Sequence, residues 1–109
     1  MLVTGKIIIK ERNTVSFMNI NDISHITCSG SLCTIHNICE KPKRVSKLLK
    51  QYEEELAESG FVRVNHNTLV NCNHISTVKL GKAHKLTLCN NIEINISRRK
   101  ISIIHEYLR

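Results

Sequence analysis

The chain has 109 residues, of which 41% are hydrophobic and 23% are charged. This is enough for one domain that buries a core without help from metals or disulfides. The chain has no run of 18 apolar residues, and its N-terminus lacks a basic segment followed by an apolar one, so we expect neither a transmembrane helix nor a secretory signal.

The positive charge is concentrated in the second half of the chain. Residues 1–60 carry 8 basic and 7 acidic side chains, whereas residues 61–109 carry 8 basic and 2 acidic ones, so +6 of the net charge of +7 lies there. Such asymmetry is expected where one face of a protein meets a polyanion, either nucleic acid or an acidic membrane. The alternative is an ordinary solvated basic surface.

The first third of the chain has the pattern of two β-hairpins. Short groups rich in Ile and Val alternate with polar turn residues, which predicts strands joined by turns. The four predicted strands are residues 4–10, 15–20, 24–28 and 32–38. Ser29-Gly30-Ser31 is the bend of the second hairpin, and Pro42 ends its ladder because proline has no N–H to donate. We expect His25 and His36 to be hydrogen-bonded or exposed sheet residues rather than ligands.

Residues 44–59 have the clearest helical pattern in the chain. Apolar residues recur at helical spacing along one stripe, and charged residues occupy the other faces. The stripe consists of Val45, Leu48, Leu49, Tyr52 and Leu56. Gly60 is a typical helix terminator. Because the second half of this helix is acidic, we interpret it as a buttress packed on a sheet rather than as a surface that contacts DNA.

Residues 61–71, FVRVNHNTLVN, predict a polar turn held on two short strands. The turn is residues 65–67, and the following Leu69 and Val70 return to the core. This arrangement leaves five polar side chains to face outward: Arg63, Asn65, His66, Asn67 and Asn71. Further strands are predicted at residues 75–80, 85–89 and 92–96, with a tight turn at residues 90–91.

The last segment predicts a helix over residues 98–108 with Ser97 as its N-cap. We expect this helix to pack through Ile101, Ile104 and Leu108. Its first turn carries three cations, Arg98, Arg99 and Lys100. Cations at the positive end of a helix dipole lower helix stability, and a polyanion lying across the helix start would remove that conflict.

Five cysteines, an odd number, occur without a C-x-x-C pair. We expect buried thiols that act as small apolar residues in a reducing cytoplasm. Cys28, Cys33 and Cys39 with His36 give the alternative of a zinc site, although structural zinc sites favour closer pairs of ligands. The alternative function is therefore a cytoplasmic cysteine and histidine domain that senses metal or redox state.

The order of two hairpins, a central helix, FVRVNHNTLVN and a last hairpin ending in ISRRK resembles the LytTR DNA-binding domain of bacterial response regulators. That family's pattern has an F-x-R-x-H-x-S-x-x-V-N segment, a following Ile and a closing V-S-R-R segment. The matching residues are Phe61, Arg63, Val70, Asn71, Ile75, Ser97, Arg98 and Arg99. The resemblance covers about residues 7–108. The chain departs from the pattern at Asn65 and Asn67, where His and Ser are usual, which affects the preferred base sequence rather than the fold.

The resemblance implies a mostly β fold with two helices, in a single domain spanning residues 1–109. This LytTR-like fold is elongated and consists of short antiparallel sheets, a central amphipathic helix and a C-terminal helix. It binds double-stranded DNA through loops set into two successive major grooves. Carried over by position, the residues that contact bases are Ser29, Ser31, His66 and Arg98. Those that contact the DNA backbone are Arg63, Asn67, Asn71, Lys82, Lys85, Arg99 and Lys100.

The chemistry of these side chains suits the implied roles. Arg98 can offer two parallel donors to guanine, and His66 can donate to a purine acceptor. Contacts to phosphates fix the register of a protein on DNA without reading sequence. Two of these residues also have an alternative role within the protein instead of a DNA contact. For Arg63 the alternative is an ion pair with a carboxylate, and for Asn71 it is the capping of a turn through backbone hydrogen bonds.

The implied function is that of a cytoplasmic transcription regulator, the output module of a two-component system. Its partners are double-stranded DNA, a second copy on direct-repeat sites and a receiver domain in the full-length protein, with no membrane and no cofactor. We expect no enzymatic activity and no metal, because a nuclease needs a carboxylate cluster and residues 61–109 have only Glu93 and Glu106. RNA binding by stacking needs exposed aromatic residues, and we assign three of the four aromatic residues to the core.

Overall fold

The computed structural model describes residues 5–81 and 83–107, which form an elongated molecule measuring 47 × 26 × 24 Å. Its strands are β1 (Lys6–Lys10), β2 (Val15–Asn19), β3 (Ile23–Ser29), β4 (Leu32–Asn37), β5 (Lys43–Ser46), β6 (Phe61–Asn65), β7 (Thr68–Asn71), β8 (Ile75–Lys79), β9 (Lys85–Leu88) and β10 (Glu93–Asn95). Its helices are α1 (Leu49–Glu55) and α2 (Ile101–Tyr107). Short 3-10 turns are η1 (Ile20–Asp22), η2 (Ala57–Ser59), η3 (Cys72–His74) and η4 (Arg98–Lys100).

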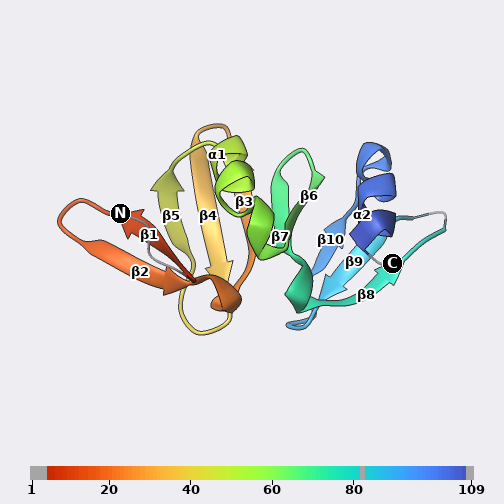
Figure 1. Ribbon diagram of the computed structural model, residues 1–109, viewed down its shortest axis with the longest axis horizontal. Helices are drawn as coiled ribbons and strands as arrows, with labels where there is room; N and C mark the ends of the chain where they lie inside the picture. Colours follow the sequence, from red (N-terminus) through yellow and green to blue (C-terminus); the bar gives the residue numbers. More distant parts are fainter. Residues whose placement is uncertain (1–4, 82, 108–109) are drawn as a thin grey trace.

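The strands form three antiparallel sheets that follow one another along the long axis (Figure 1). A two-stranded sheet, β1-β2, lies at one end, and a three-stranded sheet, β10-β9-β8, lies at the other. Between them is a five-stranded sheet in the order β5-β4-β3-β7-β6. The expected mostly β, elongated architecture is therefore confirmed, and no helix of the described residues is long and apolar enough to cross a membrane.

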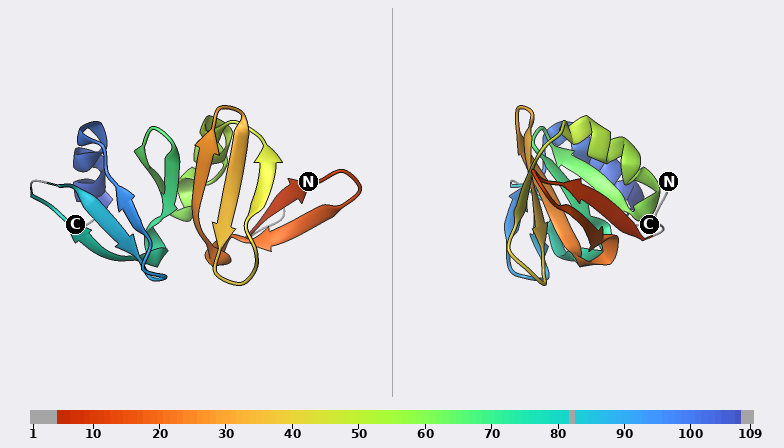
Figure 2. Two further views of the ribbon diagram at one scale, coloured as in Figure 1. Left: turned by 180° about the vertical axis from the view of Figure 1, so that it is seen from behind. Right: turned by 90° about the vertical axis from the view of Figure 1, so that its left-hand side faces the viewer.

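Two hydrophobic cores stabilise this arrangement. The first lies between the β1-β2 sheet, the five-stranded sheet and α1. The helix buries Leu49 and Tyr52 there, together with Leu56, which directly follows it. The second lies between β6-β7, the three-stranded sheet and α2, which buries Ile104. Figure 2 shows from behind that the two helices stand over different parts of the molecule. Each helix buries one apolar stripe, as expected for short amphipathic helices.

The β6-β7 hairpin belongs to both cores, because successive side chains of a strand point to opposite faces. Phe61 and Leu69 pack in the first core, and Val62, Val64 and Val70 pack in the second. This hairpin carries the polar turn that the sequence singles out. The turn is therefore supported from both sides of the strands that hold it.

The helix predicted over residues 44–59 begins later than expected. Residues 43–46 form β5, in which Val45 pairs with Cys33 of β4, and α1 starts only at Leu49. Val45 has the spacing of the helical stripe but is buried as a strand residue, while Leu48 is 53% exposed at the helix start. The α-helix also ends earlier than predicted, at Glu55, and residues 57–59 form the 3-10 turn η2. Gly60 ends this turn with a left-handed φ of +85°, so the predicted terminator is confirmed although the α-helix is shorter at both ends.

The other predicted elements agree with the structure apart from details. Both N-terminal hairpins and the strands after residue 61 are confirmed. Ser97 precedes η4, but its side chain makes no capping hydrogen bond, so the expected side-chain cap is wrong. Tyr52 and Phe61 are buried, whereas Phe17 and Tyr107 are about half exposed, so two aromatic residues rather than three lie in the core. Lys82 and Leu108 lie outside the described residues.

Candidate nucleic-acid interface

Three bends of the chain lie along one edge of the molecule. They are the β3–β4 turn, the β6–β7 turn and η4 at the start of the C-terminal helical segment (Figure 1). The view from behind in Figure 2 shows the same arrangement. We call this edge the contact edge. These are the bends that carry the residues expected to approach DNA bases.

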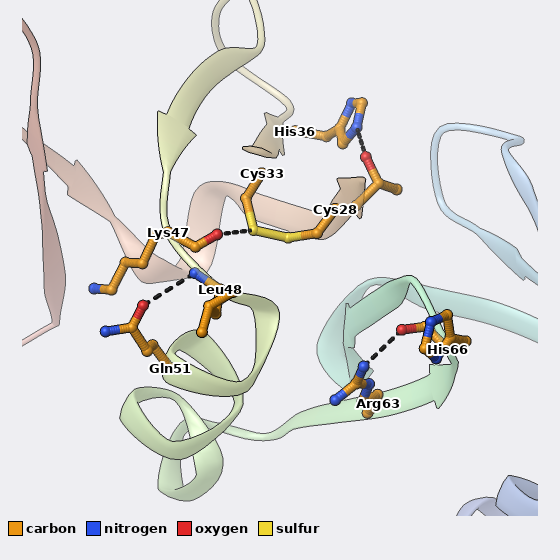
Figure 3. Close-up of a disulfide and its surroundings, with 9 residues drawn as sticks. Cys28, Cys33, His36, Lys47, Leu48, Gln51, Arg63 and His66 are labelled. Carbon is orange, nitrogen blue, oxygen red and sulfur yellow. Dashed lines mark hydrogen bonds between the residues drawn. A yellow bond between two sulfur atoms is a disulfide. The ribbon is translucent and has the colours of Figure 1, made fainter. Parts of the chain in front are cut away.

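The β6–β7 turn is held in shape by its own side chains. Nη2 of Arg63 donates a hydrogen bond to the carbonyl of His66 at 2.6 Å, as Figure 3 shows. The backbone N–H of Asn67 donates to Oδ1 of Asn65 at 2.9 Å, which is the pattern of an Asx turn. His66 and Asn67 are exposed at the tip. The turn therefore presents two polar side chains on a backbone that is fixed by hydrogen bonds.

The same turn is joined to η4. Nδ2 of Asn65 donates to the carbonyl of Asn95 at 2.7 Å, and the N–H of Ser97 donates to the carbonyl of Val64 at 2.9 Å. Between the two segments lies an open depression of about 450 Å³, which we call the Arg99 depression. It is lined by Arg63, Asn65, His66, Ser97, Arg99 and Lys100. Two motifs separated by about two dozen residues in the chain thus form one basic surface.

On its other side, the β6–β7 turn meets the β3–β4 turn. The N–H of Cys28 donates to the carbonyl of Asn67 at 2.9 Å. A smaller depression of about 220 Å³, the Lys50 depression, lies between these turns and the start of α1. Its lining includes Cys28, Gly30, Lys50, Arg63, His66 and Asn67. Arg63 and His66 line both depressions and so lie at the centre of the contact edge.

The predicted base-contacting residues are all accessible. Ser29 and Ser31 are exposed beside Gly30, whose φ of +61° suits the tight β3–β4 turn. His66 and Arg98 are also exposed. Arg98 does not line the Arg99 depression, because the three residues of a 3-10 turn point in different directions.

The predicted backbone-contacting residues fall into separate groups. Asn67 and Arg99 are exposed on the contact edge, and Lys100 is half-buried there. Lys85 is half-buried on β9, where it pairs in register with Asn95, one strand from the junction with Asn65.

Asn71 does not face outward, so the expectation that it contacts the DNA backbone is wrong. Its side chain is 1% exposed. Nδ2 donates to the carbonyl of Ile23 at 3.0 Å, and Oδ1 accepts from the N–H of Asn73 at 3.0 Å. The amide is therefore used at both ends to hold β7 and η3 against β3. The internal role considered as an alternative is the one that the structure shows.

Arg63 also takes its internal alternative. Nη1 pairs with Oε1 of Glu53 on α1 at 3.3 Å, while Nη2 holds His66. Its side chain is 23% exposed. The guanidinium thus connects the helix to the tip of the turn. We assign Arg63 to the positioning of His66 rather than mainly to a phosphate.

The cysteines differ from the expectation of buried free thiols. Cys28 of β3 and Cys33 of β4 form a disulfide across the hairpin, immediately below the β3–β4 turn (Figure 3). Cys39 and Cys89 are exposed thiols, and Cys72 is a half-buried one. Among residues 5–81 and 83–107, no three His, Cys, Asp or Glu side chains are grouped as a metal site requires.

His25 of β3 and His36 of β4 form a stacked pair, with ring centroids 4.1 Å apart. Nδ1 of His25 is hydrogen-bonded to Oγ of Ser24 at 2.8 Å, and Nε2 of His36 to Oγ1 of Thr27 at 3.0 Å. Burial, and then the like charge of His36, lower the pKa of His25 to about 4. Burial also lowers the pKa of His36. These hydrogen bonds confirm the expectation for the pair, and His25 is also buried.

Two residues of the contact edge were not assigned a role from the sequence. Asn65 was expected to face outward, but its side chain joins the β6–β7 turn to β10. The helical pattern of residues 44–59 places Lys50 among the charged residues outside the apolar stripe, whereas the structure has it in the first turn of α1 beside the β3–β4 turn. The signal used for Arg98, a cation in the first turn of a helix, applies to Lys50 once α1 starts at Leu49.

Comparisons with known proteins agree with this geometry. A family model described as the LytTr DNA-binding domain matches residues 13–109. The sensory transduction protein LytR of Staphylococcus saprophyticus is 26% identical over 98 residues, and that of Staphylococcus epidermidis is 24% identical over 96 residues. The chain aligns over 87% and 86% of its own length but spans only 38% of each relative. A solved LytTr DNA-binding domain from Bacillus cereus superposes with a TM-score of 0.81 at 16% identity, covering 97% of this chain and 98% of that one.

Proposed function

The chain belongs to the LytTR family of DNA-binding domains, and from that premise we propose that its contact edge binds double-stranded DNA in a sequence-specific manner. The observation that carries the proposal is the exposed His66 between two basic depressions. Lys50 lines one depression, and Arg99 and Lys100 line the other. A cationic surface with a polar tip at its centre suits contact with phosphates on both sides of a groove.

The three bends enter the grooves of DNA in place of a recognition helix. The long dimension of the molecule, 47 Å, exceeds the helical repeat of DNA, which is about 34–36 Å. The bends occupy only the part of this length that lies beyond the β1-β2 sheet, and we propose that they enter successive major grooves from one side of the duplex. Neither helix of the described residues presents a long basic face, since α1 is acidic in its second half and α2 has seven residues.

The side chains divide into two groups by what they contact. Ser29, Ser31, His66 and Arg98 approach base edges, where hydroxyl, imidazole and guanidinium groups can read donors and acceptors. Asn67, Lys50, Lys85, Arg99 and Lys100 hold phosphates. Asn71 belongs to neither group because it is buried. Arg63 acts on this surface by holding His66 in place.

The wider role that we propose is transcription regulation in the cytoplasm, as the output module of a two-component-type system. The chain spans 38% of the LytR relatives, which are named sensory transduction proteins. We therefore propose that a receiver domain accompanies this domain in the full-length regulator. A second copy on a direct-repeat site is the further partner that we propose.

Selection of bound fragments from a random duplex pool, followed by mobility-shift titration, tests this function. We expect an enriched sequence and an affinity that falls with salt. If about six phosphates are neutralised, the affinity drops roughly a thousandfold between 50 and 200 mM salt. Lys6→Ala, on the distant β1 strand, is the control and leaves the affinity unchanged. A pool that yields no preferred sequence would contradict specific recognition.

A further inference from the structure

The Cys28–Cys33 disulfide lies at the base of the contact edge, and its two ends connect to different parts of that edge. The N–H of Cys28 holds the carbonyl of Asn67 in the β6–β7 turn at 2.9 Å. Sγ of Cys33 lies 2.9 Å from the carbonyl of Lys47, just before α1 begins (Figure 3). Only residues 29–32 separate the two cysteines, and these residues form the β3–β4 turn.

We propose that Cys28 and Cys33 form a site of reversible oxidation that controls how tightly the contact edge binds DNA. This inference rests on the proposed function, because it concerns the affinity of the same surface. A protein that acts on DNA in the cytoplasm meets a reducing environment. Disulfides that occur there are usually transient, with catalytic or redox-sensing roles. The bond is therefore expected to be made and broken during the life of the protein.

The structure gives the two sulfurs different roles in the exchange. Cys28 is half-buried and lines the open Lys50 depression, whereas Cys33 is fully buried. A small thiolate therefore attacks Sγ of Cys28, the S–S bond breaks, and Cys33 leaves as a thiolate. Cys33 then takes a proton from water and donates it in a hydrogen bond to the carbonyl of Lys47, which already lies within 2.9 Å.

A second small thiolate completes the reduction. It attacks the small molecule's sulfur in the mixed disulfide, so that a small disulfide forms and Cys28 leaves as a thiolate. Two electrons pass from two small thiols to the protein. The reverse reaction uses a small disulfide as oxidant, which is reduced to two thiols while the Cys28–Cys33 bond forms. Low-molecular-weight thiols and their disulfides are therefore the partners of this site.

The oxidised state binds DNA more tightly. The covalent bond closes the hairpin below Ser29 and Ser31 and keeps Cys28 in place against Asn67. After reduction, the two sulfurs separate to non-bonded contact and the turn gains freedom, which must be lost again when DNA binds. Rigidifying a contact loop raises affinity by removing that cost. We expect reduction to lower affinity for the selected duplex by about three- to tenfold.

The test equilibrates the unmodified chain in glutathione buffers of varied redox ratio and measures two quantities. The bridge is measured by chymotryptic cleavage after Leu32, because the fragments on either side stay joined only when Cys28 and Cys33 are bonded. Affinity is measured on the selected duplex. We expect the linked fragments and the tighter affinity to appear and disappear together, reversibly.

Two pairs of variants complete the test, one without the bridge and one as its matched control. Cys28→Ser and Cys33→Ala each remove the bridge and are expected to give the weaker affinity at every redox ratio. Both are used because Cys33 is buried and its replacement affects folding more than that of Cys28. Cys39→Ser with Cys89→Ser removes exposed thiols only and keeps the full redox response.

The outcomes separate this inference from the proposed function. Fragments that are never linked, or are linked at every ratio, overturn the reversible bond. Equal affinity in the two states overturns the control of binding while DNA binding itself stands. Failure to bind any selected duplex in either state overturns the proposed function, and the control of binding with it.

Discussion

The side-chain amide of Asn65 donates a hydrogen bond to the backbone carbonyl of Asn95, 2.7 Å away. This bond crosses from the five-stranded sheet to the three-stranded sheet. With the bond from Ser97 to Val64, it fixes the position of η4 relative to the β6–β7 turn. Two segments that are expected to touch DNA together are thus joined before DNA is present, so binding need not bring them together.

Replacement of Asn65 by alanine should weaken DNA binding without changing its dependence on salt. The variant loses the bond to Asn95 and the Asx bond to Asn67, and it leaves the cations in place. We expect a loss of roughly 1 kcal/mol, or about fivefold in affinity, measured by mobility shift. Asn95→Ala is the matched control, because the carbonyl that accepts the bond belongs to the backbone. Equal losses in the two variants would argue against a positioning role.

Arg98, Arg99 and Lys100 should differ in what they contribute to binding. Arg98→Ala is expected to cost about 1 to 3 kcal/mol and to relax the preference at one base pair. Lys100→Ala is expected to weaken binding evenly on selected and scrambled duplexes and to reduce the salt slope by about one. Arg99→Ala should behave like Lys100→Ala. If Arg99→Ala changes the base preference and Arg98→Ala does not, the two roles are exchanged.

Alanine substitutions of Asn71 and Asn67 should have different effects, the first on the stability of the fold and the second on DNA binding. Asn71→Ala leaves the buried carbonyl of Ile23 and the N–H of Asn73 without their partner, so we expect the free energy of unfolding to fall by about 1 to 3 kcal/mol. Urea denaturation measures this loss. Asn67→Ala, at an exposed position, should leave stability within about 0.5 kcal/mol and weaken DNA binding instead. A stable Asn71→Ala protein with weakened binding would restore Asn71 to the DNA surface.

The buried His25 should make the protein less stable in acid. The pKa of His25 is about 4 in the folded protein, and its ordinary value is 6.5. Well above pH 6.5, His25 is therefore neutral in both the folded and the unfolded state, and its protonation does not lower the free energy of unfolding. As the pH falls from 6.5 towards 4, the unfolded state binds a proton that the folded state does not, and the free energy of unfolding decreases. Urea denaturation across this interval measures the slope.

His25→Phe keeps a ring against His36 and removes one of the two histidines whose pKa is lowered in the folded protein. This variant should flatten the slope relative to the unmodified chain between pH 6.5 and 4. His105→Phe, exposed on α2, is the matched control and should keep the slope. A His25→Phe protein with an unchanged slope would place the acid sensitivity in other groups.

The strands and turns were predictable because their signals are local. Apolar periodicity and polar turn residues located the hairpins, and the charge asymmetry pointed to the contact edge. The start of α1 was not predictable in this way. Val45 fits the helical stripe, and only its pairing with Cys33 across β4 makes it a strand residue. Helix spacing and a buried strand position cannot be told apart without knowing the neighbouring strand.

The roles of single polar residues depend on contacts between distant parts of the chain. Asn71 is used internally because Ile23, 48 residues away, places a carbonyl beside it. The Cys28–Cys33 bond depends on the register of β3 and β4, which puts the two residues opposite each other. Motif spacing identified the segments that form the contact edge, while tertiary pairing decides which of their side chains remain free to meet a ligand.

The β6–β7 hairpin is a wall shared by both hydrophobic cores, with Phe61 and Leu69 on one side and Val62, Val64 and Val70 on the other. A defect in either core therefore reaches the tip that carries His66. A genetic screen for lost operator recognition should therefore recover substitutions of core residues in both hydrophobic cores, in addition to substitutions of polar residues at the tip. Loss of packing in either core should weaken DNA binding, even when the substituted residue lies far from the contact edge.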